Sequence, residues 1–191
     1  MSYENLKQEI LSFATFSDHE LNLIISKFTQ NSYGAKQVIL SENKICVAIH
    51  FIVDGLVRTY YVRDGKEITT YLASDNGFIS AYSSFITQTK SAESIQFLEK
   101  TNTLSISYKQ MQELYQEIPN WQIIGRILAE QNYICMAERV LKLQAISAKE
   151  KYIDFLSTAS PKIIQRTPLI YIASFLGITP ESLSRIRKTI S

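Results

Sequence analysis

The stretch that most restricts the fold of this chain is LIYIASFLGITPESLSRIRK, residues 169–188. Ile172, Ala173 and Leu176 are three to four residues apart, so they share one face of a helix. Pro168 suits the start of that helix, where a missing N–H costs nothing, and Gly177 can end it in the left-handed conformation. The small side chain of Ala173 allows a second helix to cross closely. The pattern predicts a short helix followed by a tight turn.

A second short helix is predicted directly after the turn. Thr179 is a good N-cap, and Leu183 and Ile186 supply a buried face. The positions predicted to contact DNA are Thr179, Pro180, Glu181, Ser182, Ser184, Arg185, Arg187 and Lys188. Two helices joined in this way, the second basic on its outer side, match the helix-turn-helix that places a recognition helix in the major groove. The alternative is an ordinary helical hairpin with a charged face.

The charge of the chain is unevenly distributed. Residues 139–191 contain nine Lys/Arg and three Asp/Glu, net +6, whereas residues 1–138 contain eleven and fifteen, net −4. A basic module beside an acidic one indicates that only the C-terminal part meets phosphate.

Several classes of protein find no support in the sequence. The N-terminus MSYENLKQEI is acidic where a secretory signal is basic, and no apolar run approaches the ~20 residues of a membrane helix, so a cytoplasmic protein without membrane contact is predicted. Cys46 and Cys135 are expected to be reduced thiols. Together with His19 and His50 they do not form a metal-ligand set, and no Ser-His-Asp set or Gly-rich phosphate loop is present. We therefore predict no enzyme activity, no metal and no cofactor.

The N-terminal two thirds of the chain change pattern twice. Residues 3–30 are predicted to be helical, with Ser17 capping a second helix. Residues 35–107 then contain short runs rich in β-branched and aromatic residues, separated by turns such as Asp54-Gly55. The runs are QVIL (37–40), VAIHFIV (47–53), LVRTYYV (56–62), EITTYLA (67–73), GFISA (77–81), SIQFLE (94–99) and TLSIS (103–107). Short strands with frequent turns predict a compact β-barrel or roll.

A polar and aromatic set on these strands is a candidate lining for a ligand cavity. Arg58, Tyr60, Tyr61, Arg63 and Tyr71 lie on consecutive predicted strands. The alternative is a roll filled by its own side chains, with the arginines in solvent.

Helices are predicted again from residue 108. A short one covers 108–117, and a long one covers 120–143 with two adjacent apolar stripes, a face wide enough to pack on its own domain and on a partner helix. The predicted dimer contacts are Ile123, Ile124, Ile127, Leu128, Ile134 and Cys135. The alternative is a helix buried within one subunit. Ser147 and Glu150 form a capping box for the next helix, and Pro161 and Pro168 bound a short connection.

This order of parts resembles the cyclic-AMP receptor protein and FNR (CRP/FNR) superfamily of bacterial transcription regulators, over nearly the whole chain. The resemblance is carried by four segments: residues 50–58, HFIVDGLVR; residues 64–67, DGKE; residues 77–79, GFI; and, most specifically, residues 172–188. It implies an α+β fold with a cyclic-nucleotide-binding-like β-roll (double-stranded β-helix) at 1–118, a long dimerisation helix at 119–145 and an all-α helix-turn-helix domain at 146–191. It also implies a homodimer that binds double-stranded DNA and contacts RNA polymerase, with Glu181 and Arg185 at the base-contacting positions.

The chain departs from the family where the nucleotide would bind. The family has a Gly-Glu pair for the ribose and an Arg-Ser pair for the phosphate, and this chain has Ser80-Ala81 and at best Lys90-Ser91. We therefore predict that cyclic AMP binds weakly or not at all and that another small-molecule effector is possible. The candidate effector pocket comprises Arg58, Tyr60, Tyr71, Ser80, Ala81, Lys90 and Ser91. Since the sequence ends at Ser191, no C-terminal wing is expected, and a sensor or interaction protein with weak or no DNA binding is the alternative function.

Overall fold

The computed structural model describes residues 2–190 and begins with two helices, α1 (Ser2–Phe13) and α2 (Asp18–Ser26). As predicted, Ser17 caps α2: its side chain accepts from the Glu20 N–H while the Glu20 carboxylate accepts from the Ser17 N–H. The chain leaves helix earlier than predicted, because Thr29–Tyr33 forms strand β1. This polar segment lacks a strand-like apolar alternation, and its conformation is set by pairing with β8.

Eight strands in the described part of the chain form two antiparallel four-stranded sheets, which together make the β-roll. One sheet has the order β1-β8-β3-β6 and the other β2-β7-β4-β5. The remaining bounds are β2 (Val38–Leu40), β3 (Ala48–Asp54), β4 (Leu56–Arg63), β5 (Lys66–Ser74), β6 (Phe78–Ile79), β7 (Ser94–Phe97) and β8 (Thr101–Ser107). Gly55 makes the predicted turn between β3 and β4; at its φ of +148° a Cβ would lie 2.2 Å from Thr101 Oγ1, so only glycine fits there.

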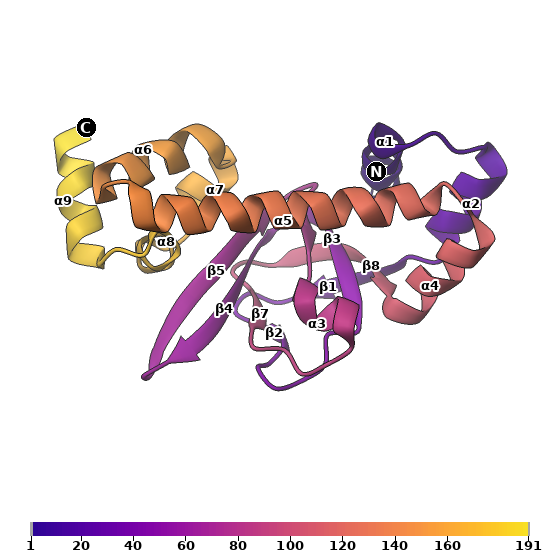
Figure 1. Ribbon diagram of the computed structural model, residues 1–191, viewed down its shortest axis with the longest axis horizontal. Coiled ribbons are helices and arrows are strands. Elements are labelled where there is room, and N and C mark those ends of the chain that lie inside the picture. The colour runs from indigo at the N-terminus through magenta and orange to yellow at the C-terminus, as the bar shows by residue number, and fades with distance from the viewer. Residues whose placement is uncertain (1, 191) are drawn as a thin grey trace.

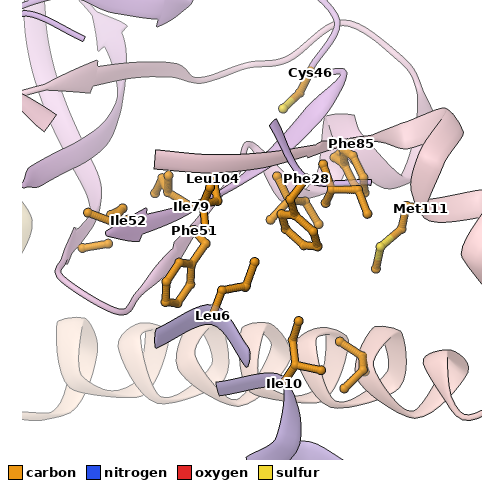
Figure 2. Close-up of a cluster of buried hydrophobic side chains, with 14 of the residues drawn as sticks. Leu6, Ile10, Phe28, Cys46, Phe51, Ile52, Ile79, Phe85, Leu104 and Met111 are labelled. Carbon is orange, nitrogen blue, oxygen red and sulfur yellow. The ribbon is translucent and has the colours of Figure 1, made fainter. Parts of the chain in front are cut away.

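The core of the roll continues into the helices that flank it. Figure 2 shows Leu6 and Ile10 of α1 facing Phe51 and other side chains of the sheet. The same cluster extends through α4 (Tyr108–Glu117) to Trp121, which is 2% exposed at the start of the long helix. The N-terminal end of the long helix is therefore fixed to the roll by apolar burial.

The long helix α5 (Trp121–Ala145) spans 25 residues and runs along almost the whole molecule (Figure 1). The roll and α1 lie along its first part, and the last four helices gather around its far end. They are α6 (Ala148–Thr158), α7 (Pro161–Arg166), α8 (Leu169–Leu176) and α9 (Pro180–Ile190); α3 (Tyr82–Thr87) belongs to the roll. No helix within residues 2–190 has the length and apolar character needed to span a bilayer.

Two details of this region differ from the sequence-based predictions. The segment between Pro161 and Pro168, expected to be a plain connection, contains helix α7, because Ser160 caps it and Pro161 occupies its first turn. Helix α3 was not predicted at all; it is a single short stretch without a side-chain cap. The capping box of Ser147 and Glu150 at the start of α6 is confirmed.

Candidate nucleic-acid interface and ligand cavities

Helices α8 and α9 form the predicted helix-turn-helix. Gly177 ends α8 at φ +66°, and the Ile178 N–H donates to the Ala173 carbonyl at 3.0 Å, which closes the turn. Ala173 and Leu183 are both fully buried where the two helices cross. The Ser182 N–H donates to Thr179 Oγ1 at 3.2 Å, so Thr179 caps α9 as predicted.

The outer face of α9 is polar and accessible. Of the eight positions predicted to contact DNA, Ser182 is half-buried and the others are exposed: Thr179, Pro180, Glu181, Ser184, Arg185, Arg187 and Lys188. Glu181, Ser184, Arg185 and Lys188 are spaced i, i+3, i+4 and i+7, so they share the face opposite buried Leu183. Figure 1 shows α9 at the end of the molecule remote from α1 and α2, where it packs on α6 and α8.

The helix-turn-helix region is docked on the outer surface of the β-roll. Arg58 of β4 is fully buried there, with its guanidinium carbon 3.6 Å from the ring centroid of Tyr171 on α8 and 4.2 Å from that of Tyr60. Its nitrogens also donate to the Glu67 carboxylate and, at 2.7 and 3.0 Å, to Gln96 Oε1. Strand β4 and helix α8 are therefore joined through one arginine.

Further polar contacts tie the same two parts together. The Thr69 N–H donates to Ser174 Oγ at 2.9 Å, and that hydroxyl donates to the Glu67 carbonyl at 3.1 Å. Lys162 of α7 reaches three carboxylates at turns of the roll, Asp54 at 2.7 Å, Asp75 at 2.6 Å and Glu99 at 3.4 Å. The hydrogen bond from Lys162 lowers the pKa of Asp54.

Two residues predicted to line an effector cavity lie elsewhere. Successive residues of a strand point to opposite faces, so Thr59 faces the interior of the roll while Arg58 and Tyr60 face outward against α8. Strand alternation predicts that β4 has two faces with different residues, but the sequence does not show that α8, more than a hundred residues later, covers the outer face. Tyr61 is half-buried and Arg63 is exposed, and neither lines the cavity.

The roll does enclose a cavity, of about 390 Å³, against helix α5. Tyr71 and Ser80 line it as predicted, together with Thr59 and Gln131. The charged groups in its wall are the acids Glu9 and Glu93, and no Lys or Arg is among the described residues that line it. Burial raises the pKa of Glu9. The wall therefore offers hydroxyls, amides and carboxylates, and nothing to neutralise a phosphate.

The other three predicted pocket residues do not line this cavity. Ala81 is buried in the core of the roll, and Lys90 is exposed on a loop. Ser91 is buried but its hydroxyl is used locally, donating to the Glu93 carbonyl at 2.8 Å and accepting from the Glu93 N–H at 2.9 Å. The Lys90-Ser91 segment therefore holds its own loop together and leaves the cavity without a cation.

The predicted dimer residues divide among three surroundings. Ile124 is 1% exposed in the core of its own roll, so it is excluded as a dimer contact. Leu128 and Cys135 line the roll cavity. Ile123 and Ile127 are half-buried and Ile134 is 54% exposed. Exposed apolar side chains continue beyond them at Tyr133, Val140 and Leu141. Tyr133 and Val140 were missed because they fall beside the stripe that the spacing picks out.

Comparison with known proteins agrees with this architecture. Residues 30–118 match the family model described as a cyclic nucleotide-binding domain. FixK2 from Bradyrhizobium japonicum has a similar structure, with a TM-score of 0.75 at 16% identity over 85% of this chain and 84% of that one. No curated protein sequence gives a match.

Two other solved structures show the same similarity. The catabolite activator protein of Thermus thermophilus has a TM-score of 0.58 at 18% identity over 95% of this chain and 86% of that one. A regulator assigned to the CRP/FNR family, from Eubacterium rectale, has a TM-score of 0.68 at 17% identity over 91% and 83%. Residues 30–118 thus match the cyclic nucleotide-binding domain model, and the chain as a whole shares its fold with these solved structures.

Proposed function

We propose that this chain is a sequence-specific DNA-binding transcription regulator with α9 in the major groove. The observation that carries the proposal is the exposed face of Glu181, Ser184, Arg185 and Lys188 opposite buried Leu183. An exposed arginine on such a face can form two hydrogen bonds to guanine, and a glutamate can accept from cytosine. Lys188, seven residues after Glu181, suits a phosphate contact. Two of the solved structures with this fold are named as regulators, which favours this function over catalysis.

The regulator acts as a homodimer through α5. Ile127, Ile134 and Leu141 recur every seven residues, the period of a coiled-coil seam, and Tyr133 and Val140 lie beside it. Ile134 and Leu141 are 54% and 64% exposed in the single chain. A second copy is the partner that fits a two-fold arrangement of recognition helices on paired half-sites about 34–36 Å apart. The functional units are residues 1–118, 119–145 and 146–191, in a cytoplasmic protein that also contacts RNA polymerase.

Selection from random duplex DNA tests the DNA-binding function. Wild-type protein should enrich a two-fold-related motif, and Arg185→Ala should lose base preference at one position of each half-site, at a cost of about 1–3 kcal/mol. Lys188→Ala should weaken binding to all sequences alike and make the salt dependence shallower by about one unit of slope per subunit. Lys149→Ala on α6, outside α9, is the control. Enrichment of no motif by wild type, or an unchanged motif with Arg185→Ala, would show the assignment to be wrong.

A second function, sensing of a small molecule, is favoured by the cavity between the roll and α5. A wall with Glu9 and Glu93 and without a cation suits a neutral or cationic effector and disfavours a cyclic phosphate. Calorimetric titration with cyclic AMP at millimolar concentration should show no heat of binding. A micromolar dissociation constant with cyclic AMP, about −8 kcal/mol, would contradict this view of the cavity.

A further inference from the structure

A second cavity, of about 230 Å³, lies where the roll meets α5, α6 and α8. Among the residues that the structure describes, only Cys135 lines both this junction cavity and the roll cavity. Thr70 of β5 contributes the wall on the side of the roll, and Phe155 and Phe175 contribute walls from α6 and α8. The junction cavity is thus built from both halves of the molecule, whereas the roll cavity contains no residue of α6 or α8.

One side of the junction cavity is apolar. Leu143, Phe155, Phe175 and Leu176 line it, with the rings of Phe155 and Phe175 tilted at 6.1 Å between centroids. Such a surface binds a hydrocarbon chain or an aromatic ring by removing it from water. About eight water molecules, at ~30 Å³ each in the liquid, would occupy the volume of this cavity. A ligand that fills it therefore has roughly eight to ten non-hydrogen atoms.

Two cations at this cavity, Arg139 and Lys151, donate to backbone carbonyls. Arg139 is half-buried, and its guanidinium donates to the carbonyls of Thr69, at 3.0 Å, and Thr70 and lies 4.6 Å from the ring centroid of Phe175. Lys151 donates to the Leu143 carbonyl at 3.0 Å. Within residues 2–190, no Asp or Glu forms an ion pair with either side chain. Both groups retain donor hydrogens that a carboxylate can accept.

Both acids of the cavity wall are paired with Lys142. Lys142 pairs with Asp154 at 2.8 Å and, more distantly, with Glu138 at 3.9 Å. The five charged side chains of the wall are therefore three cations and two anions, and the surplus positive charge lies on the side of Arg139 and Lys151. The charge of Glu93 acts on half-buried Arg139 without forming an ion pair with it, so a bound anion in direct contact would recover part of the cost of burying this charge.

We propose that the junction cavity binds a small amphipathic carboxylate, its apolar body on Phe155 and Phe175 and its carboxylate at Lys151 and Arg139. This goes beyond the proposed function, since binding here requires neither DNA nor occupation of the roll cavity. Because the walls come from the roll, α5, α6 and α8 together, the bound ligand holds the helix-turn-helix region against the roll. Any ligand that binds only the docked form stabilises it by mass action.

The test uses octanoate and phenylacetate as probes, with octanamide and phenylacetamide as neutral compounds of the same size. Binding to the full chain is followed by ligand-observed NMR and by the rise in melting temperature. Both carboxylates should bind, and the amides should bind at least about tenfold more weakly. Lys151→Met should weaken carboxylate binding about tenfold, whereas Lys149→Met, on the same helix but outside the cavity, should leave it unchanged.

A second pair of variants locates the site. Thr158→Phe places a ring in the junction cavity and should abolish binding, whereas Gln131→Phe obstructs only the roll cavity and should not. Circular dichroism confirms that each variant is folded. The proposal is overturned if neither carboxylate binds wild type, if acids and amides bind equally, or if Gln131→Phe rather than Thr158→Phe removes binding. None of these readouts depends on DNA binding, so failure here leaves the regulator function to its own test.

Discussion

Replacing Arg58 by methionine tests how the helix-turn-helix region is held on the roll. Arg58 is fully buried between the rings of Tyr60 and Tyr171, and each cation–π contact is worth about 0.5–2 kcal/mol when shielded from water. Its ion-pair partner Glu67 is 44% exposed, so solvent can take over that carboxylate when the arginine is removed. We therefore expect a loss of about 2–4 kcal/mol, less than the full cost of breaking a wholly buried ion pair.

The measurement is urea unfolding of a double-mutant cycle. Arg58→Met and Tyr171→Leu should show a coupling free energy of about 1–2 kcal/mol, because both side chains take part in one contact between the roll and α8. Arg63→Met, at an exposed position at the end of the same strand, is the control and should show no coupling with Tyr171→Leu. Protease cleavage at the α5–α6 junction should also become faster in Arg58→Met, since undocking exposes that segment. A coupling below about 0.3 kcal/mol would refute this account of the docking.

Three further predictions concern pH and assembly. Lys162→Met should lower the free energy of unfolding by about 1–2 kcal/mol at pH 7. Because the pKa of Asp54 is lowered from 3.8 in the folded protein, the stabilisation by this ion pair is present above pH 3.8 and is lost as the pH falls through the folded-state pKa. Urea unfolding should therefore show a smaller difference between Lys162→Met and wild type at pH 3 than at pH 7. Burial lowers the pKa of His50 from 6.5 to about 4, so as the pH falls the unfolded chain is protonated at this residue before the folded chain. The free energy of unfolding of wild type should therefore fall by about 3 kcal/mol between pH 6.5 and 4. His50→Phe should lack this loss in urea unfolding, and His19→Gln, at an exposed position, should retain it. Ile134→Asp should yield monomers by light scattering at micromolar concentration and Asn132→Asp, on the opposite side of α5, should not; monomeric wild-type protein would contradict the seam.

Local chemistry made the elements of this fold predictable. The capping boxes at Ser17 and Ser147 need only residues three apart, and both are present. The turn at Gly177 and the burial of Leu183 also depend only on their own neighbours in sequence. Strand β1 was missed because its polar residues gain their conformation from β8, more than sixty residues away. The periodicity of α5 showed an apolar helix but not which side meets the roll, and this is why Ile124 was misassigned.

The cavity walls and the docking contacts were harder to predict, because they join segments that are far apart in the sequence. An arginine in a run of β-branched and aromatic residues suggests a ligand, and Arg58 was interpreted in that way. Its actual partner on the other chain segment, Tyr171, looked like an ordinary residue of an amphipathic helix. Strand alternation could have shown the orientation of Arg58. Because Val57 and Thr59 face the interior of the roll, Arg58 between them faces outward.

Strands β4 and β5 contribute both to the roll cavity and to the contacts with α5 and α8, so ligand binding in the roll can change the position of α9 through them. On β5, Tyr71 lines the roll cavity while the adjacent Thr70 lines the junction cavity and accepts a hydrogen bond from Arg139. On β4, Thr59 lines the roll cavity and Arg58 holds Tyr171 of α8. A ligand that displaces either strand therefore acts on the docking contacts one residue away, with no intervening layer of side chains. The Arg58–Tyr171 cycle repeated with a bound ligand measures the free energy of this coupling directly.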